Sequence, residues 1–111
     1  MEHFSLDTLE GLNIIQSEFK NYQENFFPER KSEFFCLELN GEAGELANAE
    51  KKLWKGKKVE KALLEDEAAD VFIALINYTN SRQINLCKSV REKLIKIEEK
   101  RNMLAIRGEE Y

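Results

Sequence analysis

Proline is almost absent from this chain, and this constrains the fold more than any other feature of the sequence. The 111 residues contain one proline, Pro28, and five glycines. Because proline and glycine interrupt helices and form tight turns, so few of them predict long helices with few connections. A chain of this length is expected to form one domain, residues 1–111.

Apolar residues recur at every third or fourth position in four segments, which is the pattern of an amphipathic helix. We expect helices over residues 6–24, 33–55 and 59–80, and a fourth over residues 86–104. Gly56 is expected to end the second helix. The N-caps expected for the first, second and fourth helices are Ser5, Ser32 and Asn85.

No segment shows the strict alternation of a β-strand, so the sequence predicts an all-α fold, a four-helix bundle. The apolar stripes are long for a chain of this size, and a single copy would leave part of them uncovered. We therefore expect oligomerisation to complete the bundle, which makes the protein a homo-oligomer.

Net charge, hydropathy and histidine content argue against several classes of protein. The formal net charge is -4, whereas a dedicated nucleic-acid binder would carry a basic face, so we expect no nucleic-acid partner. No apolar run reaches transmembrane length and no signal-peptide pattern is present, so we expect no membrane partner and a cytoplasmic location. The only histidine, His3, lies near the N-terminus, which disfavours histidine-based catalysis and zinc binding.

Four acidic residues interrupt the predicted core stripes of the second and third helices. The segments "GEAGEL" and "EAAD" each place two acids three residues apart, Glu42 with Glu45 and Glu67 with Asp70. Residues at i and i+3 share a helix face, and both pairs lie within or beside the apolar stripe. Carboxylates in such a position are costly unless a cation neutralises them. Packed against each other, the two helices would form an oxygen-only site suited to Mg²⁺, with Mn²⁺ as a substitute.

The alternative interpretation of each acidic pair is a solvated helix face that pairs with lysines. That interpretation is the usual one for a single pair in a chain with 34 % charged residues. Two pairs on consecutive helices, both beside the core and both flanked by glycine or alanine, are more specific. Small residues would leave room beside a metal ion, and Gly41 and Gly44 are otherwise unfavourable inside a helix.

The two motifs together resemble those of the MazG-like nucleotide pyrophosphohydrolases, members of the all-α NTP pyrophosphatase superfamily. "GEAGEL", 21 intervening residues, and "EAAD" followed by "VFIALINY" correspond to the ExxE, spacer and ExxD pattern of that family, and the likeness covers residues 35–101. The resemblance implies hydrolysis of a nucleoside triphosphate between its α and β phosphates, giving the monophosphate and pyrophosphate. It implies a homodimer or homotetramer, and the implied magnesium ligands are Glu42, Glu45, Glu67 and Asp70.

The family pattern continues into the fourth helix, where a lysine and an arginine meet the phosphates. The segment "VREKLIKIEEKRN" offers Lys93 and Arg101 for this role, with Lys96 and Lys100 as competitors. The alternative is an exposed helix of alternating charge. At Ile97 the chain departs from family members that carry an asparagine, which leaves the nucleotide contacts of this helix open.

The remaining substrate contacts follow from residues near the acidic faces. Asn77 could bond the sugar or base, and Trp54 could stack on the base, although aromatic residues are more often core. The water that attacks the phosphate needs a base, and a carboxylate not fully engaged with metal, Glu42 or Glu38, is the candidate catalytic residue.

Other classes of protein remain as alternatives. A ferritin-like di-metal bundle normally uses Glu-x-x-His, and this chain has no usable histidine. A non-catalytic helical interaction module would use the acids as a binding surface without metal. A MazG-like protein that binds a nucleotide but hydrolyses it slowly also fits the motifs.

Overall fold

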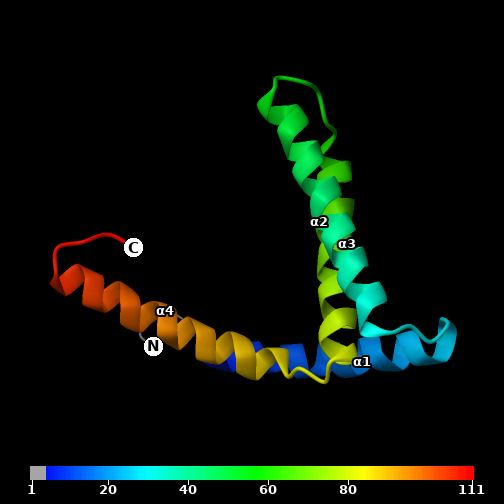
Figure 1. Cartoon of the computed structure of the whole chain (residues 1–111), viewed down its shortest axis with the longest axis horizontal. Helices are drawn as coiled ribbons and strands as arrows, with labels where there is room; N and C mark the ends of the chain where they lie inside the picture. The colour runs from blue at the N-terminus through cyan, green and yellow to red at the C-terminus, as the bar shows by residue number, and fades with distance from the viewer. Residues whose placement is uncertain (1–4) are drawn as a thin grey trace.

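A computed structural model describes residues 5–111, so His3 lies outside the described residues. These residues form a short 3-10 helix and four α-helices, and they contain no β-strand. Figure 1 shows α2 and α3 as an antiparallel hairpin that rises from α1, with α4 leading away from the base of that hairpin. The elements are η1 (Leu6–Glu10), α1 (Gly11–Phe26), α2 (Ser32–Trp54), α3 (Lys61–Ser81) and α4 (Leu86–Ile106).

The α2–α3 hairpin is the most extensively packed pair of elements in the molecule. Its core comes from the apolar stripes of both helices and includes Phe35, Ala49, Ala74 and Ile76, all of them buried. The turn begins at Gly56, which adopts a φ of 81°. Glycine takes this left-handed conformation without strain, and this position after a helix end is where it is most often found.

A buried glutamine fixes the corner between α3 and α4. The Gln16 side chain of α1 donates hydrogen bonds to the Thr79 hydroxyl at 3.2 Å and to the Ile84 carbonyl at 2.8 Å. Its oxygen accepts a bond from the backbone N–H of Leu86 at 3.0 Å. The Asn85 side chain then caps α4 by accepting from the Lys88 N–H. One side chain thus connects the end of α3 to the start of α4, and so sets the direction in which α4 leaves.

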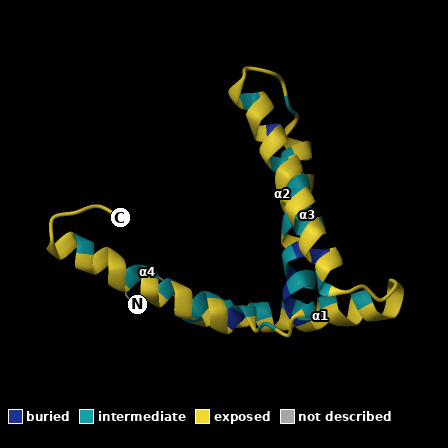
Figure 2. Cartoon of the chain, in the orientation of Figure 1, coloured by how far each residue is buried: buried dark blue, intermediate teal, exposed yellow. Residues whose placement is uncertain are grey.

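The single chain is not compact. Its radius of gyration is 17.5 Å, whereas about 13 Å is typical of a compact domain of this length. Its accessible surface is 8626 Å², about 2,300 Å² more than a compact protein of 13.0 kDa exposes. Figure 2 shows exposed residues along both arms of the molecule, with the buried ones concentrated where α1 meets the hairpin. The excess surface includes Leu37, Trp54 and Ile106, which are 73 %, 87 % and 88 % exposed.

The helix ends predicted from sequence agree with the structure within one or two residues, with two corrections. Ser32 begins α2 instead of capping it, because the Phe34 N–H already bonds the Lys31 carbonyl. Ser5 precedes the first helix, but its side chain makes no capping bond, and the first turn is 3-10 instead of α. The Asn85 cap and the Gly56 stop are confirmed. Within residues 5–111, no helix is long and apolar enough to cross a bilayer.

Candidate metal centre

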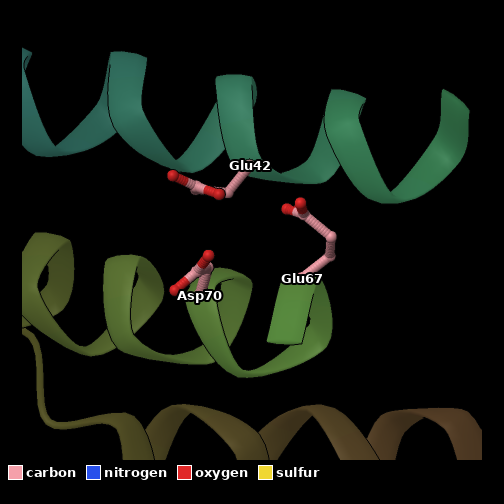
Figure 3. Close-up of side chains that lie close together, drawn as sticks. All are labelled: Glu42, Glu67 and Asp70. Atoms are coloured by element: carbon pink, nitrogen blue, oxygen red, sulfur yellow. The ribbon is translucent and has the colours of Figure 1, made fainter. Parts of the chain in front are cut away.

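The acidic residues of α2 and α3 meet halfway along the hairpin. Glu42, Glu67 and Asp70 each offer a carboxylate oxygen, and the three oxygens lie within 4.8 Å of one another. Figure 3 shows the three side chains reaching from the facing helices into the space between them. The two helices run antiparallel, so acids near the middle of each helix arrive at the same height, as the sequence predicted.

Two of the three carboxylates of this centre have an oxygen that is shielded from water and has no partner among residues 5–111. Glu42, Glu67 and Asp70 are all half-buried. The two shielded atoms are Oε2 of Glu42 and Oε2 of Glu67, and neither accepts a hydrogen bond from any part of the chain that the structure describes. A polar oxygen removed from water without a partner is unfavourable, and more so when it is charged. A cation bound among them would satisfy both atoms, and an all-oxygen donor set fits Mg²⁺ or Mn²⁺.

Burial and mutual repulsion shift the ionisation of this centre. Desolvation, followed by the nearby charges of Glu45 and Asp70, raises the pKa of Glu42 from 4.5 to about 7. Burial also raises the pKa of Glu67, and the neighbouring carboxylate of Glu45 raises it further. The acids are therefore crowded enough to favour either a proton or a metal ion.

Glu45 and Glu38 take different positions beside the centre. Glu45 is exposed and lies outside the converging triad, but it is close enough to raise the pKa of both Glu42 and Glu67. It therefore borders the centre on its open side. Glu38 lies one helical turn before Glu42, is half-buried, and lines a cleft next to the centre.

That cleft opens where the α1–α2 connection passes the base of the hairpin. It has a volume of about 410 Å³, and Glu38 of α2 and Asn77 of α3 lie on its hairpin side. The Asn77 side chain is half-buried and makes no hydrogen bond with any residue from 5 to 111. The cleft is otherwise mainly aromatic, and its rings come from Phe19, Tyr22, Phe27, Phe34 and Phe35.

The cationic residue of this cleft, Arg30, was not predicted from sequence. Its guanidinium lies over the Phe34 ring, 4.7 Å from the ring centre, so a cation borders the aromatic wall. Arg30 belongs to the connection after Pro28 and carries no helical periodicity. The signal in the sequence was the proximity of an arginine to Phe34, which is common and does not indicate a site.

The structure separates three predicted substrate residues from the acids. Trp54 lies at the tip of the hairpin, 87 % exposed and apart from the cleft. Lys93 and Arg101 belong to α4, which packs on α1 and η1 and leads away from the hairpin (Figure 1). Asp70 is about 16 Å from the end of α3, and Arg101 is about 22 Å into α4 at 1.5 Å per residue. The guanidinium of Arg101 bonds the Glu98 carboxylate at 2.6 Å, and this ion pair raises the pKa of Arg101.

Comparison with known proteins adds no further identification. No protein-family model, no curated protein and no solved structure matches the chain. The evidence for a function therefore comes from the acidic residues that the hairpin brings together.

Proposed function

We propose that this protein is a Mg²⁺-dependent pyrophosphohydrolase that cleaves nucleoside triphosphates to monophosphates and pyrophosphate. The observation that supports the proposal is the convergence of Glu42, Glu67 and Asp70 within 4.8 Å, with two shielded oxygens that lack partners. Surface acids rarely combine these features, because burial without a counter-charge is unfavourable. The resemblance of both acidic motifs to the MazG-like family supplies the reaction, and control of nucleotide pools would be its cytoplasmic role.

Different residues of the hairpin would bind the metal ion and accept the proton. Glu42, Glu67 and Asp70 would hold Mg²⁺ with Glu45 beside them, and the ion would supply charge neutralisation and an acidified water. Glu38 lies on the cleft side of this group and is free to accept a proton. Glu42 has a pKa of about 7 in the metal-free centre. Once Mg²⁺ is bound, it would accept a proton only through a carboxylate oxygen that does not hold the ion. These two carboxylates are therefore the proposed catalytic bases.

The cleft beside Glu38 is the proposed site for the nucleoside. Its aromatic walls suit a flat base, and the amide of Asn77 can donate and accept hydrogen bonds at the base edge or the sugar. Asn77 lies two turns from Asp70 on the same face of α3, so a nucleoside in the cleft would direct its phosphates toward the acids.

A second copy of the chain is the proposed cover for the exposed apolar surface. The excess of about 2,300 Å² over a compact monomer falls in the range that obligate homodimers bury. Around Gly41 and Gly44 a methyl group would meet no atom within 4 Å, so another helix can approach there. Lys93 and Arg101 could then reach a phosphate only from a partner subunit, and the choice between homodimer and homotetramer stays a prediction.

A product assay tests the proposed reaction. The protein is incubated with each NTP and dNTP, with Mg²⁺ or with EDTA, and the products are separated by ion-exchange chromatography. We expect monophosphate and pyrophosphate that depend on Mg²⁺. Diphosphate with orthophosphate would contradict the proposed bond, and absence of turnover with every nucleotide would favour the non-catalytic interaction module.

Variants of the acidic residues locate the activity. Glu45→Ala and Asp70→Ala should lose at least about 100-fold in kcat/KM, because both alter the charge around the metal. Glu50→Ala is the matched control, since Glu50 is an exposed acid on the same helix. If Asp70→Ala and Glu50→Ala keep similar rates, the centre is assigned wrongly even where the protein is an active enzyme.

A further inference from the structure

The hairpin carries a strongly basic tip next to the acidic centre, although the chain as a whole is acidic. Residues 51–61 contain a single acid, Glu60, and among the described residues only Lys58 of this segment forms an ion pair, with Glu60 at 3.8 Å. The lysines of the tip are Lys51, Lys52, Lys55, Lys57, Lys58 and Lys61.

One lysine of the tip shares a helix face with Glu45, the acid that borders the centre. At 100° per residue, Lys52 lies about 20° from Glu45 around the axis of α2 and about 10 Å along it. Glu38 lies on this same face, on the opposite side of Glu45. Lys51 shares the helix end but lies about 120° from Glu45, on a different face. The open face of α2 therefore runs from the aromatic cleft, past the acids, to Lys52.

We propose that Lys52 binds the outer phosphates of the substrate and supplies the cation that the sequence assigned to the fourth helix. This inference rests on the proposed function for the identity of the ligand. In the chain itself, α4 packs on α1 and η1, and Arg101 is engaged with Glu98. Lys52 makes no ion pair with any residue from 5 to 111, so its ammonium group is available.

The chemistry of the face sets the direction of the bound nucleotide. With the base in the aromatic cleft and the α phosphate at the acids, the β and γ phosphates extend toward the tip. An ammonium group there would neutralise the charge that develops on the pyrophosphate leaving group. The lysines also complement the C-terminal dipole of α2, and this structural role is common to Lys51 and Lys52. Only Lys52 combines it with the face of Glu45.

Binding of inorganic tripolyphosphate tests the assignment independently of turnover. The affinity of the full-length protein for tripolyphosphate is measured by calorimetry in Mg²⁺, for the wild type and for Lys52→Gln and Lys51→Gln. We expect Lys52→Gln to weaken binding roughly tenfold, the value of one charge-assisted hydrogen bond, and Lys51→Gln to change it less than about twofold. The same order should appear in KM for the triphosphate, whereas the melting temperature should fall by a similar small amount in both variants, because both lose a charge at the end of α2.

The other outcomes separate this inference from the proposed function. Selective loss in Lys52→Gln with no nucleotide turnover by the wild type would support the phosphate site and refute the hydrolase. Equal losses in both lysine variants, no loss in either, or no binding by the wild type would overturn the assignment of Lys52. A loss in Arg30→Gln with none in Lys52→Gln would also overturn it, because the phosphates would then point into the cleft.

Discussion

Glu42 is the residue on which the candidate site depends most. It occupies a position of α2 that faces α3, in the same stripe as the buried residues Phe35 and Ala49. An apolar side chain there would extend the hairpin core. Desolvation and the charges of Glu45 and Asp70 raise the pKa of the carboxyl group at this position to about 7. An apolar side chain at this position would make the protein more stable, whereas the carboxyl group of Glu42 can bind a proton or a cation.

The raised pKa of Glu42 predicts a stability that falls with pH in the absence of metal. In the unfolded chain this carboxyl ionises near 4.5, whereas in the folded protein it keeps its proton to about 7. The folded state therefore binds more protons between these values, and the free energy of unfolding declines across that window. Thermal melts in EDTA from pH 4.5 to 8 should show a decreasing melting temperature, and Mg²⁺ should reverse the loss at pH 8.

The variant Glu42→Gln is the control for this prediction. It removes the ionisation and keeps the shape, so the decline in EDTA should flatten and the gain from Mg²⁺ should shrink. A wild-type melting temperature that rises from pH 4.5 to 8 in EDTA would contradict the assignment of Glu42 as a desolvated carboxyl.

Among the elements, the α2–α3 hairpin was the most predictable from sequence. Its apolar stripes, the Gly56 stop and the two acidic pairs are all local signals, and an antiparallel hairpin needs only a short connection to bring them together. Glu45 shows the limit of such signals. It pairs with Glu42 in the motif, yet it is exposed beside the triad, whereas Glu67 and Asp70 have the same spacing and both join it.

The path of α4 was not predictable, because it depends on a long-range contact. Gln16 reaches across more than sixty residues to Thr79, Ile84 and Leu86, and in the sequence it is one polar residue among several on α1. The apolar stripe of α4 is equally consistent with packing against the hairpin. The direction of α4, and hence the placement of Lys93 and Arg101, depends on this buried amide together with the packing of α4 on α1 and η1.

Replacing Gln16 with leucine should destabilise this corner. Gln16→Leu leaves the Leu86 N–H and the Ile84 carbonyl without their partner, at a cost of about 1–3 kcal/mol for each group that stays buried. Urea unfolding should show a loss of about 3 kcal/mol in the free energy of unfolding. The control Ser17→Ala alters an exposed neighbour and should change it by less than about 0.5 kcal/mol. Equal stabilities for the two variants would mean that the amide does not fix the corner.

On the scale of the whole molecule, the sequence predicts the number and class of helices but not their closure. All four stripes were expected to meet in one bundle, yet only α2 and α3 pack along their lengths, and the chain extends over 51 × 40 × 23 Å. Helix periodicity identifies which face is apolar, but it does not say whether the same chain or another copy covers that face. A second copy of the chain is the cover that we propose for the exposed faces.

The association state in solution tests this explanation of the open shape. Light scattering after size exclusion should give a mass at least twice the 13.0 kDa of one chain at micromolar concentration. The variant Leu37→Glu should reduce that mass, because Leu37 is 73 % exposed in one chain and lies on the same face of α2 as Gly41 and Gly44. In an isolated chain such a surface change costs little, whereas burying an unpaired charge between two copies is strongly unfavourable. Glu50→Gln is the control and should keep the wild-type mass. A wild-type mass of 13.0 kDa would mean that the exposed apolar surface serves another partner.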